Sequence, residues 1–284
     1  MALPSKPPKA EFDSPVERLL ASMANLRRRP TSKGAHFFRT SLRRFQAWSD
    51  VFHPPTGSEQ KPALKCLNKL RKATGKLRDS AVQLDLLDQL PGNSADQRKL
   101  KKTLKSRRKS CRKKLKTILR DPGLPRLRRM LRAVHAPRKT SENAELQSAA
   151  GTERLALDEY RAYVGRRGAL TTENLHEYRL ACKRFRYIAE LGGDVPDAKE
   201  LVDTWKRVQD VIGEWHDYVM LTDLVEKVLG DSRLRSSLLE LRDKKYAESV
   251  IAVEEAESNL IERPAPSLKK PPRGARPVRS SNAA

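Results

Sequence analysis

Two stretches of the sequence carry histidine and basic residues in one order and at one spacing. The pattern is His-x-x-Arg-x-x-x-basic-basic, and it starts once in each half of the chain. Its members are His36, Arg39, Arg43 and Arg44 in the first copy and His176, Arg179, Lys183 and Arg184 in the second. Arginine binds two phosphoryl oxygens at once, lysine supplies a compact charge, and histidine donates one or two N–H groups. The pattern therefore predicts a site for a phosphate-rich anion.

Helical periodicity places these cations on one face. At about 100° per residue, His36, Arg39 and Arg43 share a stripe, and Phe38 and Leu42 lie opposite. The second copy divides in the same way and adds Arg186 and Tyr187 to its basic side. An ordinary solvated helix face is the alternative. Neither stripe contains an acid at the i,i+4 spacing of a salt-bridged surface, and this favours an external anion.

A second repeated pattern follows each basic stripe. It is Gly-x-x-x-Asp, at Gly75 and Asp79 in the first half and at Gly213 and Asp217 in the second. Lysines precede it on the same face, namely Lys65, Lys72 and Lys206. A glycine within a helix costs about 1 kcal/mol relative to alanine, which indicates close approach of a neighbouring helix or of a ligand. The aspartates are predicted to orient the arginines of the basic stripes; plain surface ion pairs are the alternative.

The order of these patterns defines the organisation of the chain. The histidines are 140 residues apart (176 − 36) and the glycines 138 (213 − 75). Leucine-rich segments with a period near 3.6 alternate with Pro/Gly breaks, and strand-like alternation is missing, so the chain is predicted to be all-α. We expect two four-helix bundles related by a pseudo-twofold axis. The boundaries are a disordered tail at 1–13, bundles at 14–135 and 142–262, a linker at 136–141 and a disordered basic tail at 263–284.

The composition also predicts a polyanionic partner. The 284 residues include 59 Lys+Arg and 35 Asp+Glu, a formal net charge of +24, which exceeds what solubility requires. No stretch is long and apolar enough for a membrane span, so we expect a cytoplasmic protein. The three cysteines are far apart and predict neither a disulfide framework nor a metal site.

The segment from Arg98 to Arg120 contains thirteen Lys and Arg residues and no acid. Its apolar residues form one narrow stripe, so it is predicted to be a helix with a strongly basic exposed side. Lys105, Arg108 and Arg112 represent that side. We expect them to extend the anion site or to contact nucleic acid weakly and without sequence preference.

Outside the tails, both halves resemble the CHAD family, the conserved histidine α-helical domain. The resemblance rests on the two histidine patterns and on the Gly-x-x-x-Asp that follows each. It implies two four-helix bundles that bind inorganic polyphosphate in a basic channel or cleft without catalysis, with polyphosphate granules as the expected location. The stripe residues, with Lys65, Lys72 and Lys206, would bind the polyphosphate, and Gly75, Asp79, Gly213 and Asp217 would shape the site. Gln46 and Asn68 stand where the family pattern has basic residues.

Two other functions compete with this interpretation. A DNA- or RNA-binding protein would use the basic segment 98–120 and the C-terminal tail. A metal-dependent phosphohydrolase would use His216 and Asp217, but further metal ligands at suitable positions are missing from the sequence. Neither a Gly-rich phosphate loop nor a Ser/His/Asp arrangement is present, so we expect no catalytic residue, cofactor or metal.

Overall fold

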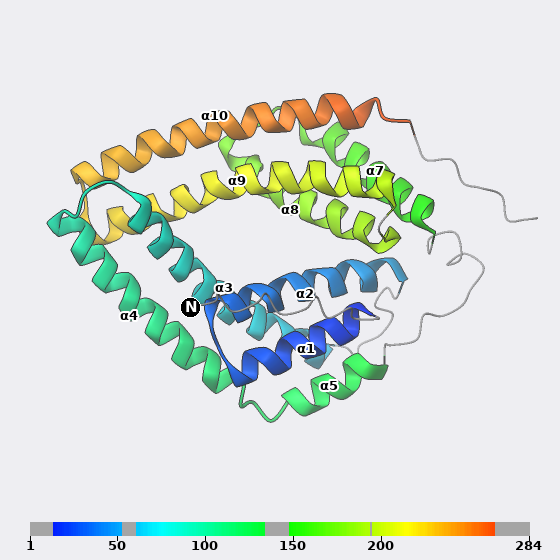
Figure 1. Ribbon diagram of the computed structural model, residues 1–284, viewed down its shortest axis with the longest axis horizontal. Coiled ribbons are helices and arrows are strands. Elements are labelled where there is room, and N and C mark those ends of the chain that lie inside the picture. Colours follow the sequence, from blue (N-terminus) through cyan, green and yellow to red (C-terminus); the bar gives the residue numbers. More distant parts are fainter. Residues whose placement is uncertain (1–13, 53–60, 134–147, 194, 265–284) are drawn as a thin grey trace, which may run out of the picture.

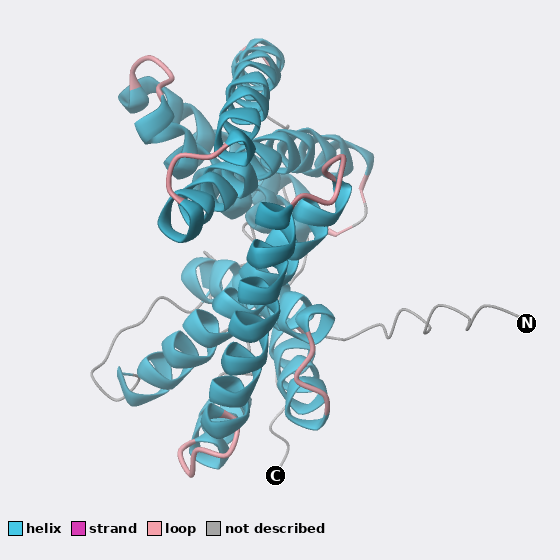
Figure 2. Ribbon diagram, turned by 90° about the vertical axis from the view of Figure 1, so that its left-hand side faces the viewer, coloured by secondary structure: helices cyan, strands magenta, loops and turns pink. Residues whose placement is uncertain are grey.

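The computed structural model describes residues 14–52, 61–133, 148–193 and 195–264, and these are helical and contain no strand (Figures 1 and 2). The first half contains α1 (Pro15–Arg28), α2 (Ser32–Phe52), α3 (Lys61–Gln89), α4 (Ala95–Ile118) and α5 (Leu124–Ala133). The second contains α7 (Ala149–Arg167), α8 (Thr172–Ala189), the short 3-10 helix η2 (Glu190–Gly192), α9 (Pro196–Leu229) and α10 (Arg233–Ile261). The all-α prediction is confirmed. The predicted linker and most of the predicted tails lie outside the described residues.

Local sequence signals explain where several helices begin. The Ser14 hydroxyl accepts a hydrogen bond from the Glu17 N–H and caps α1. Helix α8, which begins at Thr172, is capped by Thr171. Its hydroxyl accepts from the Asn174 N–H, while the Asn174 side chain accepts from the Thr171 N–H. This reciprocal pair satisfies two otherwise unpaired backbone donors at the start of the helix.

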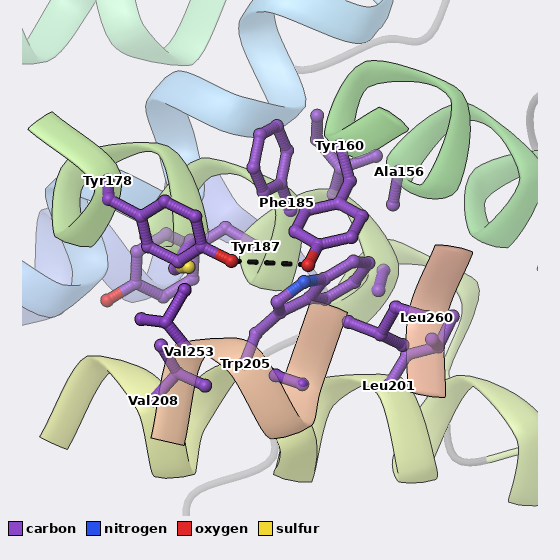
Figure 3. Packing of buried hydrophobic residues seen from close by; sticks show 14 of the residues in the cluster. Ala156, Tyr160, Tyr178, Phe185, Tyr187, Leu201, Trp205, Val208, Val253 and Leu260 are labelled. Carbon is purple, nitrogen blue, oxygen red and sulfur yellow. Dashed lines mark hydrogen bonds between the residues drawn. The ribbon is translucent and has the colours of Figure 1, made fainter. Parts of the chain in front are cut away.

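Each half has its own apolar core. In the first half, Phe38 and Leu42 of α2 pack with leucines of α1, α3 and α5. In the second, Trp205 of α9 lies against the ring of Tyr160, whose hydroxyl pairs with that of Tyr178 at 3.2 Å (Figure 3). These aromatic contacts fix α7, α8 and α9 against one another. The apolar faces of α2 and α8 thus point into separate cores, which leaves their basic residues near the boundary between the halves.

A third core joins the two halves. Leu87 of α3 and Leu104 of α4 pack in one cluster with Leu221 of α9 and Leu238 of α10. Nearby, the Gln83 side-chain amide donates to the Met220 carbonyl at 3.0 Å. The sequence predicts two four-helix bundles, and the structure adds a core that the outer ends of α3, α4, α9 and α10 share. The pseudo-twofold relation between the halves stays a prediction.

The halves also meet along α2 and α8, which pack side by side in the middle of the molecule (Figure 1). Helices α3 and α9 pack on each other as well. The four helices that carry the repeated patterns therefore come together. None of the described helices has a stretch apolar enough to span a lipid bilayer.

Candidate anion-binding site

The central feature is a group of cations between α2 and α8. Arg39 and Arg43 come from α2, and Arg179 and Lys183 come from α8. The charge of Arg43 acts on both Arg179 and Lys183, so the side chains of the two halves lie close together. We call these four residues the central cluster.

Two of these arginines rest on the glycines of the second pattern. The Arg39 guanidinium donates to the Arg71 carbonyl at 3.0 Å, and a Cβ added to Gly75 would lie 2.8 Å from its Nη1. The second half repeats the arrangement. There, Arg179 Nε donates to the Gln209 carbonyl at 3.4 Å. In each case the carbonyl belongs to the residue four positions before the glycine.

The glycines therefore make room for arginine side chains. A Cβ at Gly213 would lie 3.0 Å from Arg179 Nη2 and 3.5 Å from its Cζ. The sequence predicts close approach of a neighbouring helix or of a ligand, and the described contacts are of the first kind, made by a side chain of the neighbouring helix. An arginine from the adjacent helix occupies the space because only a residue without Cβ lets a guanidinium lie directly on a helix.

Asp79 and Asp217 lie near these arginines without forming an ion pair with them among the described residues. Burial and neighbouring Arg43 lower the pKa of Arg39, and Asp79 opposes that change. The pKa of Asp217 is raised to about 6, mainly by burial, while the charge of Arg179 acts against the rise. The described contacts that orient the guanidiniums are backbone carbonyls, and the carboxylates contribute longer-range attraction.

Lys183 is the most unusual member of the central cluster. Its side chain is only 4% exposed, and it forms no ion pair among the described residues. Burial lowers its pKa to about 6, and Arg179, Arg43, Arg39 and Arg186 lower it in the same direction. The charge of Asp217 is close enough to interact with it, but only at longer range. Such a lysine costs free energy unless an anion is present.

The histidines lie beside this group in different surroundings. The His176 ring lies against the His216 ring, with centroids 4.5 Å apart, and its buried Nδ1 has no hydrogen-bond partner among the described residues. Burial lowers the pKa of His216 to about 4, with His176 and Arg179 adding to the effect. His36 has Arg78 as its most strongly interacting charged neighbour. His216 and Arg78 occupy corresponding positions, since 216 − 78 = 138, so the repeat offset could have identified Arg78.

Three predicted binding residues contact carboxylates instead of lying free. Arg44 Nε is 2.6 Å from the Glu190 carboxylate, and Arg186 is 3.5 Å from the same side chain. Arg184 contacts Glu159 at 2.7 Å and Asp50 at 2.9 Å. These acids come from α7, from η2 and from the far end of α2. Glu190 lies four residues after Arg186, so the prediction that the stripes lack acids at the i,i+4 spacing is wrong for the second stripe. Tyr187 is buried between the guanidiniums of Arg44 and Arg186.

A cavity of about 350 Å³ opens beside the central cluster between α2, α3 and α8. Arg43 and Lys183 line it from two sides, together with Arg184 and Tyr187. Gln46 and Asn68, the two departures from the basic pattern, also line it. The first half thus presents amide groups where the second presents cations.

The remaining predicted residues are exposed. Lys65 and Lys72 lie on α3, and Lys206 lies on α9. Lys105, Arg108 and Arg112 lie on α4, at the edge of the molecule (Figure 1). No described interaction joins these three to the central cluster. Among the described residues, no group of three or more side chains is arranged to hold a metal ion.

Comparisons with known proteins agree on one family. The family model described as "CHAD domain" matches residues 11–226. The crystal structure of the CHAD domain from the plant Ricinus communis superimposes with a TM-score of 0.64 at 15% sequence identity, and the match covers 90% of each chain. A search of curated proteins returned no match. The family model spans most of the chain, including both histidine patterns, and the chain therefore belongs to the CHAD domain family, non-catalytic binding domains generally linked to polyphosphate.

Proposed function

We propose that this protein binds inorganic polyphosphate without catalysis in the cavity between α2, α3 and α8, beside the central cluster. The observation that carries the proposal is Lys183, which is buried against arginines and has no ion-pair partner among the described residues. Packing cations together away from water is unfavourable unless their charge is neutralised. A polyanion in the adjacent cavity would supply that neutralisation.

The arrangement of the cations supports a linear chain of phosphates. Residues three or four apart on a helix rise by about 5–6 Å, so α2 and α8 present cations at intervals beside the cavity. Arg39 and Arg179 are held by backbone carbonyls and glycines on the opposite helices, so their remaining N–H groups are pre-oriented. Contacts of this kind neutralise phosphates without reading a sequence.

The other predicted residues take different roles in this proposal. Arg44, Arg184 and Arg186 hold α2, α7, α8 and η2 together through their carboxylate partners, and Tyr187 packs between two of them. His36 and His176 donate hydrogen bonds at the end of each stripe. Lys65, Lys72 and Lys206 are exposed and attract the anion over a longer range. Location in the cytoplasm, at polyphosphate granules, belongs to the same proposal.

The proposal is tested by titrating labelled long-chain polyphosphate into the full chain and competing it with duplex DNA at physiological salt. We expect excess duplex DNA to leave polyphosphate bound at the central site, and Arg43→Gln to weaken polyphosphate binding by about tenfold, the size of one charge-assisted contact. Arg166→Gln, at an exposed position near the end of α7, makes the same charge change and should have little effect. Equal losses from both variants would show that only net charge matters.

The glycines provide a second test. In Gly75→Ala, the new methyl group displaces the Arg39 guanidinium, because the Cβ would lie 2.8 Å from Nη1. The end of an arginine side chain moves easily, and alanine favours helix by about 1 kcal/mol, so thermal stability should be unchanged or raised. Polyphosphate affinity should fall by about threefold to tenfold, because Arg39 loses its fixed orientation.

Gly165→Ala is the matched control, since Gly165 lies within α7 and a Cβ there would meet no atom within 4 Å. It should gain helix stability without any change in binding. Unfolding curves and isothermal titration of both variants separate the two effects. An unaltered polyphosphate affinity in Gly75→Ala would show that Arg39, in its position against Gly75, does not contact the ligand.

A further inference from the structure

Helix α4 is fixed at both ends and unpacked in its middle. Ser94 and Gln97 form a capping box at its start, and Leu100 and Leu104 lie in the third core. Leu115 lies in the core of the first half. Between these anchors, every residue from 105 to 110 is exposed. Over one and a half turns, therefore, no side chain of α4 is buried against the body.

Across the exposed segment 105–110, the positions that would continue the apolar stripe of α4 are occupied by cations. The stripe runs from Leu104 to Cys111, and the intervening core-facing positions are Arg107 and Arg108, both exposed. Lys101 contacts Asp88 at 2.7 Å near the start of the helix. Beyond it, no cation of α4 has an ion-pair partner among the described residues. Like charges four residues apart destabilise an isolated helix, so this segment is held in helical form by its anchors.

These cations surround much of the helix. At about 100° per residue, Lys105, Lys109 and Arg112 lie within roughly 60° of one another on the outer line. Arg108 flanks that line on one side and Lys113 on the other, and Lys114 lies about 180° from Lys105. The result is a convex rod with positive charge on both flanks. The central cluster differs in shape, because two of its cations, Arg43 and Lys183, line a cavity.

We propose that the middle of α4 is a second, separate binding site, and that it takes the major groove of double-stranded DNA. The major groove is about 12 Å wide and admits an α-helix between two phosphate strands. Cations on both flanks of α4 can each reach one strand, whereas a single polyphosphate chain touches one side only.

Two further features select the ligand. The segment 105–116 contains no aromatic residue, so it lacks the stacking surface with which proteins hold single-stranded nucleic acids. It also contains no Asn or Gln, the side chains that pair with adenine in the major groove. Binding therefore goes through the phosphates and is independent of sequence.

The test compares two triple variants of the full chain that remove the same charge. Lys105→Gln/Lys109→Gln/Arg112→Gln changes the outer line of α4. Lys199→Gln/Lys227→Gln/Lys244→Gln changes three exposed lysines of α9 and α10. Glutamine favours helix, and circular dichroism checks that each variant is folded. Fluorescence anisotropy with a short labelled DNA duplex, at several salt concentrations, gives affinity and salt dependence.

The α4 variant should lose at least about tenfold in duplex affinity. The slope of its plot of log K against log salt should become less negative by about 2–3, roughly one unit for each lost phosphate contact. Its polyphosphate affinity should stay within twofold. The α9/α10 variant should bind DNA nearly as the natural chain does. Equal DNA losses in both variants, an equal loss of polyphosphate binding in the α4 variant, or no duplex binding by the natural chain would each overturn the inference. DNA binding and polyphosphate binding are measured separately. A negative result for DNA therefore does not bear on polyphosphate binding at the central site.

Discussion

Replacing Lys183 with methionine is expected to weaken polyphosphate binding at least tenfold and to stabilise the free protein. A charge-assisted contact contributes about 1.5–3 kcal/mol, which corresponds to more than a tenfold change in affinity. In the absence of an anion the same amino group is buried beside arginines, where a pKa of about 6 makes holding its proton at neutral pH unfavourable. Methionine keeps the length of the side chain and removes the charge, so the free protein should gain about 1–4 kcal/mol, as when other buried charges are replaced by apolar residues.

The pH dependence of that gain follows from the lowered pKa. Lys183 has a pKa of about 6 in the folded chain, against 10.5 for an ordinary lysine. Between pH 6 and pH 10.5, the unfolded chain therefore holds a proton on this lysine that the folded chain lacks. The free energy of unfolding decreases steadily as the pH falls from 10.5 to 6. The stability gain of Lys183→Met should be small near pH 10, large at pH 7 and constant below pH 6.

Urea unfolding at these pH values measures the gain, and isothermal titration at pH 7 measures the loss of binding. Lys199→Met is the matched control, because Lys199 is exposed on α9 and its replacement should alter neither quantity strongly. A Lys183→Met variant less stable than the natural chain would show that the lysine is already neutralised within the protein, and would remove the main support for the central site.

Much of this fold could be predicted because the signals are local. The α9 segment begins at Pro196 and ends before Gly230, which has a positive φ of 69°, and proline and glycine are the residues that mark helix ends most clearly. The stripes of α2 and α8 were predictable for a similar reason. Helical geometry alone places Arg39 near Arg43 and Arg179 near Lys183 on one face.

The partners of the stripe residues could not be predicted in the same way. Glu190 lies 146 residues after Arg44 in the sequence, yet their side chains form an ion pair, and nothing in the local pattern pairs them. The third core is a similar case, since Leu104 and Leu221 resemble the leucines of the other cores. Only the way the helices pack determines which carboxylate neutralises which arginine, and so which cations stay available.

This distinction separates Lys183 from Arg184, its neighbour in the sequence. Arg184 is half exposed and contacts two carboxylates, with Glu159 bound through both oxygens. Lys183 is buried and has no such partner among the described residues. The sequence pattern treats both as equivalent basic residues, and both line the cavity. Arg184 holds helices together through its carboxylate partners, whereas Lys183 has no carboxylate partner among the described residues.

Polyphosphate binding is expected to take up protons, and its affinity should fall as the pH rises from 6.5 to 8.5. Lys183 and Asp217 both have a pKa of about 6 in the free protein, and both face Arg179. A bound polyanion favours the protonated form of each, so it raises both values. At pH 7.5 the two groups are mostly deprotonated before binding, and binding draws protons onto them.

Each proton taken up makes the affinity fall by about tenfold per pH unit until the pH reaches the raised value in the complex. With Lys183 as the main acceptor, we expect a loss of about 30-fold to 100-fold between pH 6.5 and pH 8.5. Titration calorimetry at pH 7.5 in two buffers with different ionisation enthalpies should report uptake of about one proton. His176 and His216, whose pKa values are lowered by burial and by nearby cations, add to the uptake below pH 6.5.

Lys183→Met separates this mechanism from a general effect of pH on a basic protein. The variant lacks the main proton acceptor, so its affinity, although lower, should change less than threefold between pH 6.5 and 8.5, with Asp217 left to account for that change. Affinity for the DNA duplex, proposed to bind at α4, should depend on pH equally in the natural chain and the variant. Proton release on polyphosphate binding, or an equal pH dependence of polyphosphate affinity in both proteins, would show that Lys183 is already charged before the anion arrives.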